Sequence, residues 1–104
     1  MIQIIRLTYH DDMDGSTSVS VMPCASIMSA KEIILKEINK GFEDDFKSLN
    51  EAATELSKDL VCCVWDEESN TFHWYDNGKG ETYIVGRINE RELNTNWQNI
   101  GEIS

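Results

Sequence analysis

Apolar and polar residues alternate with a period of two near the start of the chain, and this pattern predicts strands. Residues 2–9 are rich in β-branched and apolar side chains. Residues 16–21 alternate serine with threonine or valine, which is typical of a strand with one hydrated face. The intervening residues 10–15 are acidic and rich in turn formers. The two segments therefore predict an N-terminal hairpin, which we expect to end at Pro23.

A helix is predicted next, over roughly residues 30–40. The segment Ser29–Glu32 has the sequence of a capping box, in which a serine oxygen and a glutamate satisfy free amides of the first turn. Met28 and Ile33 occupy the two positions of a hydrophobic staple around that start. Gly41 stands where a glycine usually ends a helix.

A second helical pattern follows, because apolar residues between positions 42 and 60 recur in steps of three, four and seven. Ser48–Glu51 is another capping box. The helix can therefore start at residue 43, where the apolar pattern begins, or at residue 49, directly after the Ser48 cap.

The last third of the chain again predicts strands. Leu60–Trp65 is apolar on both faces, which favours a central strand. The other segments follow in order: a polar turn over 66–70, an aromatic strand over 71–75, a hairpin turn over 77–80, a strand over 82–88 and a cap for one short helix at 89–92. From about residue 98 the pattern is weak.

The order β-β-α-α-β-β-β predicts an α+β fold. Hairpins at both ends with helices between them favour a mainly antiparallel sheet of about five strands, with the helices packed on one face. A length of 104 residues suits a small single compact domain over residues 1–104.

Charge narrows the classes of partner. Nine Lys and Arg against nineteen Asp and Glu give a formal net charge of −10. Direct binding to nucleic acid or to an anionic membrane would be repulsive, so we expect neither. A basic partner protein would be attracted. The alternative is that the charge serves only solubility.

The acidic residues are clustered, and these clusters are the candidate partner-binding residues. Glu51, Glu55 and Asp59 are spaced to share one face of a helix, with a carboxylate every ~6 Å. Rows of this kind resemble the repeat of a phosphate backbone. The other acidic candidates are Asp44, Asp45, Asp66, Glu67 and Glu68.

Aromatic residues supply a second candidate surface. On the strand over 71–75, His73 and Tyr75 point to one side and Phe72 and Trp74 to the other. We expect His73 and Tyr75 to form a protein-contact patch beside Tyr83, because aromatic side chains anchor interfaces. A sheet covered on both faces is the alternative.

The sequence gives little support for a catalytic site or a metal-binding site. A calcium loop that starts at His10 would use Asp12, Asp14 and Ser16, but Val21 stands where a bidentate glutamate is needed. A cysteine enzyme would need Cys24 near His10 and a third, orienting group. We predict that Cys62 and Cys63 are core thiols. The sequence therefore predicts no catalytic residue, metal or cofactor.

The function predicted from these features is that of a small acidic inhibitor or decoy. It would occlude a basic, nucleic-acid-binding partner, as phage anti-defence inhibitors such as anti-CRISPR proteins and nuclease-immunity proteins do. One alternative is a structural or self-associating subunit, and another is a metal-dependent or cysteine enzyme. Three cysteines without a disulfide pattern, and no secretory segment, predict a cytoplasmic protein.

Overall fold

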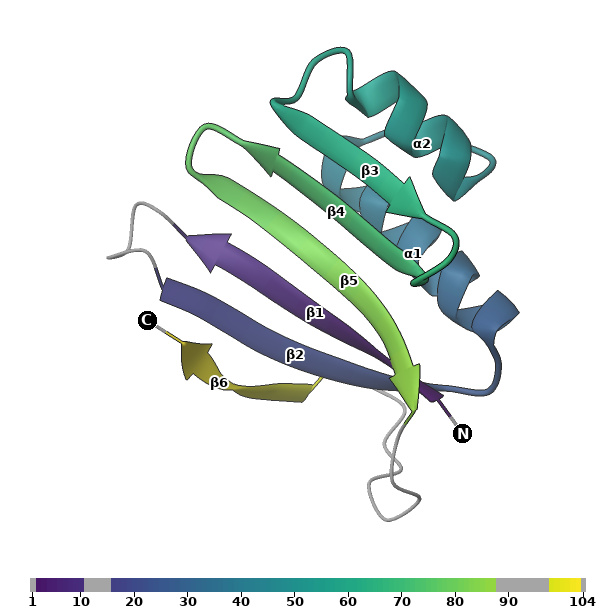
Figure 1. The fold of residues 1–104 in the computed structure, drawn as a ribbon, viewed down its shortest axis with the longest axis vertical. Helices are drawn as coiled ribbons and strands as arrows, with labels where there is room; N and C mark the ends of the chain where they lie inside the picture. Colours follow the sequence, from purple (N-terminus) through teal and green to yellow (C-terminus); the bar gives the residue numbers. More distant parts are fainter. Residues whose placement is uncertain (1, 11–15, 88–97, 104) are drawn as a thin grey trace.

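The computed structural model describes residues 2–10, 16–87 and 98–103, which form six strands and two helices (Figure 1). All pairings are antiparallel, and the sheet order is β3-β4-β5-β1-β2-β6. The elements are β1 (Ile2–His10), β2 (Ser16–Cys24), α1 (Ile27–Phe42), α2 (Leu49–Leu56), β3 (Cys62–Asp66), β4 (Thr71–Asp76), β5 (Lys79–Arg87) and β6 (Gln98–Ile103).

The predicted α+β fold is confirmed, with five expected strands in one antiparallel sheet and two helices on one face. β6 is an additional strand beside β2, in the segment whose pattern was too weak to predict one. The predicted cap at 89–92 and most of the calcium-loop candidate lie outside the described residues. No helix in the described ranges is long and apolar enough to cross a membrane.

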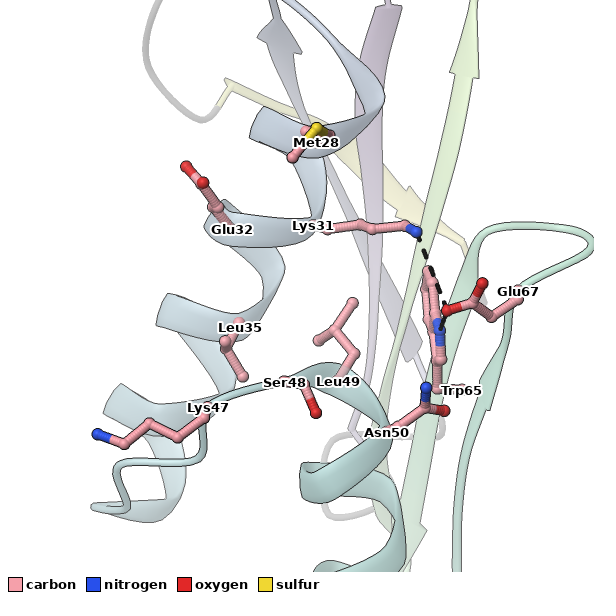
Figure 2. A pocket seen from close by; sticks show the side chains of 10 residues that line it. All are labelled: Met28, Lys31, Glu32, Leu35, Lys47, Ser48, Leu49, Asn50, Trp65 and Glu67. Carbon is pink, nitrogen blue, oxygen red and sulfur yellow. Dashed lines mark hydrogen bonds and ion pairs between the residues drawn. The ribbon is translucent and has the colours of Figure 1, made fainter.

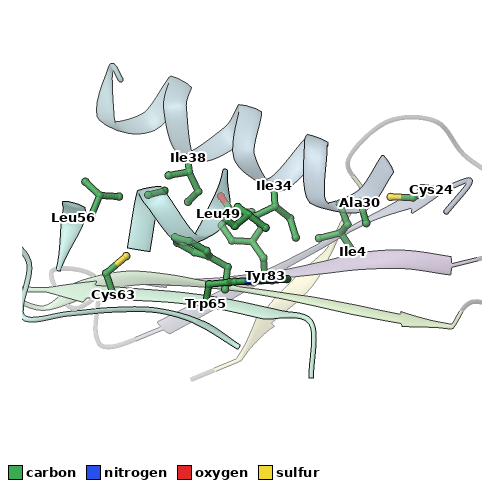
Figure 3. Close-up of a cluster of buried hydrophobic side chains, with 12 residues drawn as sticks. Ile4, Cys24, Ala30, Ile34, Ile38, Leu49, Leu56, Cys63, Trp65 and Tyr83 are labelled. Atoms are coloured by element: carbon green, nitrogen blue, oxygen red, sulfur yellow. The ribbon is translucent and has the colours of Figure 1, made fainter. Parts of the chain in front are cut away.

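The core lies between the helices and one face of the sheet (Figure 3). Side chains alternate across a strand, so every second residue of the sheet faces the helices. Ile4, Phe72 and Tyr83 point to that side and are at most 1% exposed. Ile34 and Ile38 of α1 are equally buried and recur at the helical spacing of four.

Helix α1 is longer at both ends than its capping signals predict. Ser26, not Ser29, is the N-cap, and its hydroxyl accepts a hydrogen bond from the Ser29 amide at 3.1 Å. The predicted hydrophobic staple is wrong, because Met28 is 74% exposed. Gly41 lies inside the helix, and Glu43 takes the left-handed C-cap conformation with φ 55°. Phe42 packs edge-on against a sheet tryptophan, which favours the extra turn.

Helix α2 starts at residue 49, which resolves the alternative left open by the sequence. The Ser48 hydroxyl accepts a hydrogen bond from the Glu51 amide at 3.1 Å. The Glu51 carboxylate in turn accepts one from the Lys47 amide, also at 3.1 Å. These two hydrogen bonds satisfy one free amide of the first helical turn and the amide of the residue before the N-cap.

Two predictions about strands are wrong. Pro23 does not end β2, which continues to Cys24 with Pro23 opposite Gln3. β3 is an edge strand rather than a central one, and Val64 is 52% exposed. Its helix-facing residues are buried, so an edge strand with one apolar outward side chain gives the same pattern as a central strand.

Candidate protein-interaction surfaces

The ten predicted partner-binding residues fall on two different sides of the molecule. His73 and Tyr75 belong to β4 and point away from the helices. The acidic candidates follow the helical layer and the β3–β4 turn. The sequence-based candidates therefore do not form one site, and each surface has its own chemistry.

The first surface, here called the acidic helical surface, runs from the end of α1 through α2 and the turn after it. The acidic residues that define this surface are all exposed. Two lysines, Lys47 and Lys58, lie in the same stretch, so carboxylates outnumber ammonium groups by six to two. The six carboxylates belong to Glu43, Asp44, Asp45, Glu51, Glu55 and Asp59.

The regular helical row of carboxylates predicted from the sequence is wrong. α2 ends at Leu56, so Asp59 lies in the following turn and not on the helix. Glu51 is engaged in the cap at Lys47, and Glu55 is bound by the Lys58 ammonium at 3.1 Å. The surface is acidic, but its charges do not repeat along one helix face.

The acidic residues of the β3–β4 turn hold the local structure. Glu67 accepts a hydrogen bond from the indole Nε1 of Trp65 at 3.1 Å, and it lies 4.0 Å from the Lys31 ammonium (Figure 2). Hydrogen bonds from the Ser69 side chain and the Glu68 amide hold the pKa of Asp66 below its ordinary value. Asp66 and Glu67 thus have intramolecular partners.

A groove of about 280 Å³ lies between α1, α2 and this turn (Figure 2). Trp65 forms one wall, and the Lys31 ammonium lies 5.5 Å from its ring centroid, within range of a cation–π contact. Exposed Met28 stands at one end. Lys47 and Glu32 also line the groove, so it carries both signs of charge and favours no single ligand class.

The second surface is the side of the sheet opposite the helices, here called the open face (Figure 1). The strand registers assign to it the odd-numbered residues 3–9, 17–23 and 71–75 and the even-numbered residues 62–66 and 80–86. Asp66, at its outer edge, is the one Asp, Glu, Lys or Arg residue in this set, which also contains His73. In a chain with 27% charged residues, such a surface is unusual.

A shallow hollow of about 370 Å³ lies on the open face. The Tyr9 and Tyr75 rings stand 6.3 Å apart on either side of Gly80, where no side chain rises from the sheet. His73 is joined to Thr82 by a 2.8 Å hydrogen bond. The hollow is lined by Leu7, Tyr9, Thr17, His73, Tyr75, Gly80 and Thr82, and also by Glu81, which the register places among the helix-facing residues of β5.

The predicted contact of Tyr75 and His73 with Tyr83 is wrong. Tyr83 pairs with Phe72, so it faces the helices and is 1% exposed. Tyr9 takes the place expected for Tyr83. The sequence indicated Tyr9 only as a strand residue, because its position beside Tyr75 depends on the long-range pairing of β1 with β5.

The cysteine-enzyme alternative conflicts with the β1–β2 register. His10 lies opposite Ser16, whereas Cys24 lies opposite Ile2 at the other end of the hairpin. Eight residues of strand separate them, roughly 26 Å. Burial raises the pKa of the Cys24 thiol, which disfavours its thiolate form.

Cys63 behaves similarly. Burial and the neighbouring Cys62 raise its pKa to about 11. Cys63 is a core thiol as predicted, whereas Cys62 is partly exposed on the open face. Across the described ranges, no group of three or more His, Cys, Asp and Glu side chains is arranged to hold a metal ion.

Comparison with models of protein families found no match, and comparisons with curated proteins and with solved structures found none either. The two surfaces themselves are therefore the basis for assigning a function.

Proposed function

We propose that this protein is a small acidic inhibitor, or decoy, that binds a basic partner protein through the acidic helical surface. The partner is a nucleic-acid-binding protein, such as a nuclease, whose basic groove the carboxylates occupy. The protein thereby competes with nucleic acid for that groove.

The observation that carries this proposal is the segregation of charge between the two sides of the molecule. Six exposed carboxylates accompany two lysines on the acidic helical surface, while the open face has Asp66 alone. Charge concentrated on one side orients a protein as it approaches an oppositely charged partner and raises the association rate. A surface acidified only for solubility would not require this separation.

The structure refines the predicted form of mimicry. Without a regular row of carboxylates on α2, the surface does not reproduce the spacing of phosphates along a strand. The proposed competition therefore depends on the local density of negative charge. We expect the affinity to fall steeply with salt, because nucleic-acid-binding grooves are recognised largely through their charge.

Affinity capture from a bacterial lysate at low and high salt, with mass spectrometry of the eluate, tests the proposal. The expected result is a basic nucleic-acid-binding protein that is lost at high salt and is displaced by added DNA. Capture of a neutral partner that is indifferent to salt and DNA would contradict it.

Charge reversal then locates the surface. Replacing Glu51, Glu55 and Asp59 by lysine is expected to abolish capture while the circular dichroism spectrum stays native. A matched pair of single variants provides the control, since Glu55→Lys and Glu32→Lys change the charge equally at exposed helical positions. The first should weaken capture more than the second. Equal effects would mean that net charge, and not this surface, is recognised.

A further inference from the structure

We propose that the open face is the interface of a homodimer, in which two copies of this chain pack their sheets face to face. This inference is independent of the decoy function, because it uses the opposite side of the molecule. Each copy would contribute the same surface, as a two-fold symmetric dimer requires.

The side chains of the open face can pack against the same side chains of a second copy. Rows of residues run across neighbouring strands, and the central row joins Ile84, Ile5 and Val21. The next row joins Thr82, Leu7 and Val19, of which Val19 is already buried in the single chain at 8% exposure. Aliphatic and hydroxyl side chains of this kind can be buried against identical ones, with no unpaired charge trapped between them.

The dimensions suit a stable dimer. Three strands of nine residues and two of five and six, about 4.8 Å apart, give a face of roughly 600 Å², near the lower end of stable interfaces. A standard interface buries about 800 Å² on each partner. Aligned packing of two twisted sheets is the arrangement found in β-sandwiches.

The net charge of −10 does not oppose this arrangement. Both helices lie on the far side of the sheet, so a face-to-face dimer keeps the two acidic helical surfaces on its outside. Two sheets and the helices behind them separate these surfaces by about 30 Å. That is several times the Debye length of about 8 Å at physiological salt, so their mutual repulsion is screened.

A second copy fits this face better than a basic partner does. A basic partner needs carboxylates to contact, and among the described positions the open face offers Asp66 alone, at the β3 edge. The hollow between Tyr9 and Tyr75 is walled by aromatic rings and floored by Gly80. An apolar side chain from the facing sheet would fill it without an ionic contact.

Sedimentation equilibrium over a range of protein concentrations measures the dimer directly. Leu7→Glu places like charges beside the central row of both facing surfaces, and we expect it to raise the dimer dissociation constant about a hundredfold. Val64→Glu is the second variant, because Val64 is already 52% exposed in the monomer and its replacement endangers folding less. Asn50→Glu, exposed on α2, adds the same charge and should leave the dimer intact.

Alkylation of Cys62 gives an independent readout, because this thiol lies on the open face whereas Cys24 and Cys63 are buried. Its reaction with a maleimide should slow as the protein concentration rises through the dimer dissociation constant. Two results would overturn the proposal: a wild-type chain that is monomeric at every concentration, or a dimer unaffected by Val64→Glu. If Leu7→Glu does not fold, the sedimentation of Val64→Glu alone tests the proposed dimer.

Discussion

Trp74 and Glu81 stand directly opposite each other on β4 and β5, and the indole Nε1 donates a hydrogen bond to Glu81 Oε1 at 3.3 Å. The same carboxylate accepts hydrogen bonds from the Tyr83 hydroxyl at 3.1 Å and the Thr8 hydroxyl at 3.2 Å. Glu81 therefore connects three adjacent strands beneath α1. Burial, and after it the negative charge of Glu81, raise the pKa of Tyr83 above its ordinary value.

Removing this shared acceptor should destabilise the fold. Glu81→Ala removes an acceptor that three donors share, and we expect a loss of about 2–4 kcal/mol. Glu55→Ala, which removes an exposed ion pair with Lys58, should cost less than about 1 kcal/mol. Urea unfolding monitored by tryptophan fluorescence measures both. Similar losses for the two variants would show that the shared acceptor has no special role.

Two strand glycines should respond differently to the same substitution. A Cβ atom at Gly80 would lie 2.5 Å from the Trp74 carbonyl oxygen and 3.1 Å from Tyr75 Cα, both of which are backbone atoms. Gly80→Ala should therefore cost about 1–3 kcal/mol through overpacking. At Gly86 nothing lies within 4 Å of the added atom, so Gly86→Ala should be near neutral. The melting temperatures of the two variants measure the difference. Equal shifts for Gly80→Ala and Gly86→Ala would contradict the prediction.

Stability should fall in alkaline solution because of Cys63. Its thiol pKa rises from an ordinary 9.0 to about 11 in the folded protein, so the unfolded chain loses its proton first. The stabilisation is complete below pH 9 and is lost as the pH rises towards 11. Between pH 8 and pH 10 the wild type should lose about 1 kcal/mol more than Cys63→Val. A parallel loss in the two proteins would assign the pH dependence to other groups.

Asn39 should control the connection between the helices. Its side chain accepts a hydrogen bond from the Phe46 amide at 2.9 Å and donates one to the Phe46 carbonyl at 3.1 Å. Asn39→Ala should cost about 1–2 kcal/mol and speed amide exchange at Phe46. Asn50→Ala makes the same change at an exposed position and should leave that exchange rate unaltered. Unchanged exchange in Asn39→Ala would contradict this role.

The local sequence patterns predicted the elements better than their ends. The Asn77–Gly78 hairpin turn was predictable, because both residues adopt positive φ, of 48° and 88°. The start of α1 was not, because Ser26 and Ser29 both suit an N-cap and the choice depends on packing against the sheet. Similarly, Gly41 had the identity of a helix end, but the contact of Phe42 with Trp74 extended the helix past it.

The candidate surfaces were less predictable because they depend on which strands become neighbours. His73 and Tyr75 were correctly placed on one side of β4 by alternation alone. Whether Tyr83 or Tyr9 stood beside them depended on the register of β5 against β4 and against β1. The lack of charge across the open face likewise emerges only when residues from five strands are brought together.

The position of β1 between β5 and β2 has a consequence for how the chain folds. The two strands of the β1–β2 hairpin are neighbours in the sequence, but β5 pairs with β1 across about 70 to 85 positions, from His10 with Lys79 to Ile2 with Arg87. During synthesis both edges of this hairpin therefore lack their neighbours, β1 until β5 has been made and β2 until β6 has been made. Pairings this distant in sequence slow folding to about milliseconds or longer, and until they form, the unpaired strand edges are exposed to aggregation.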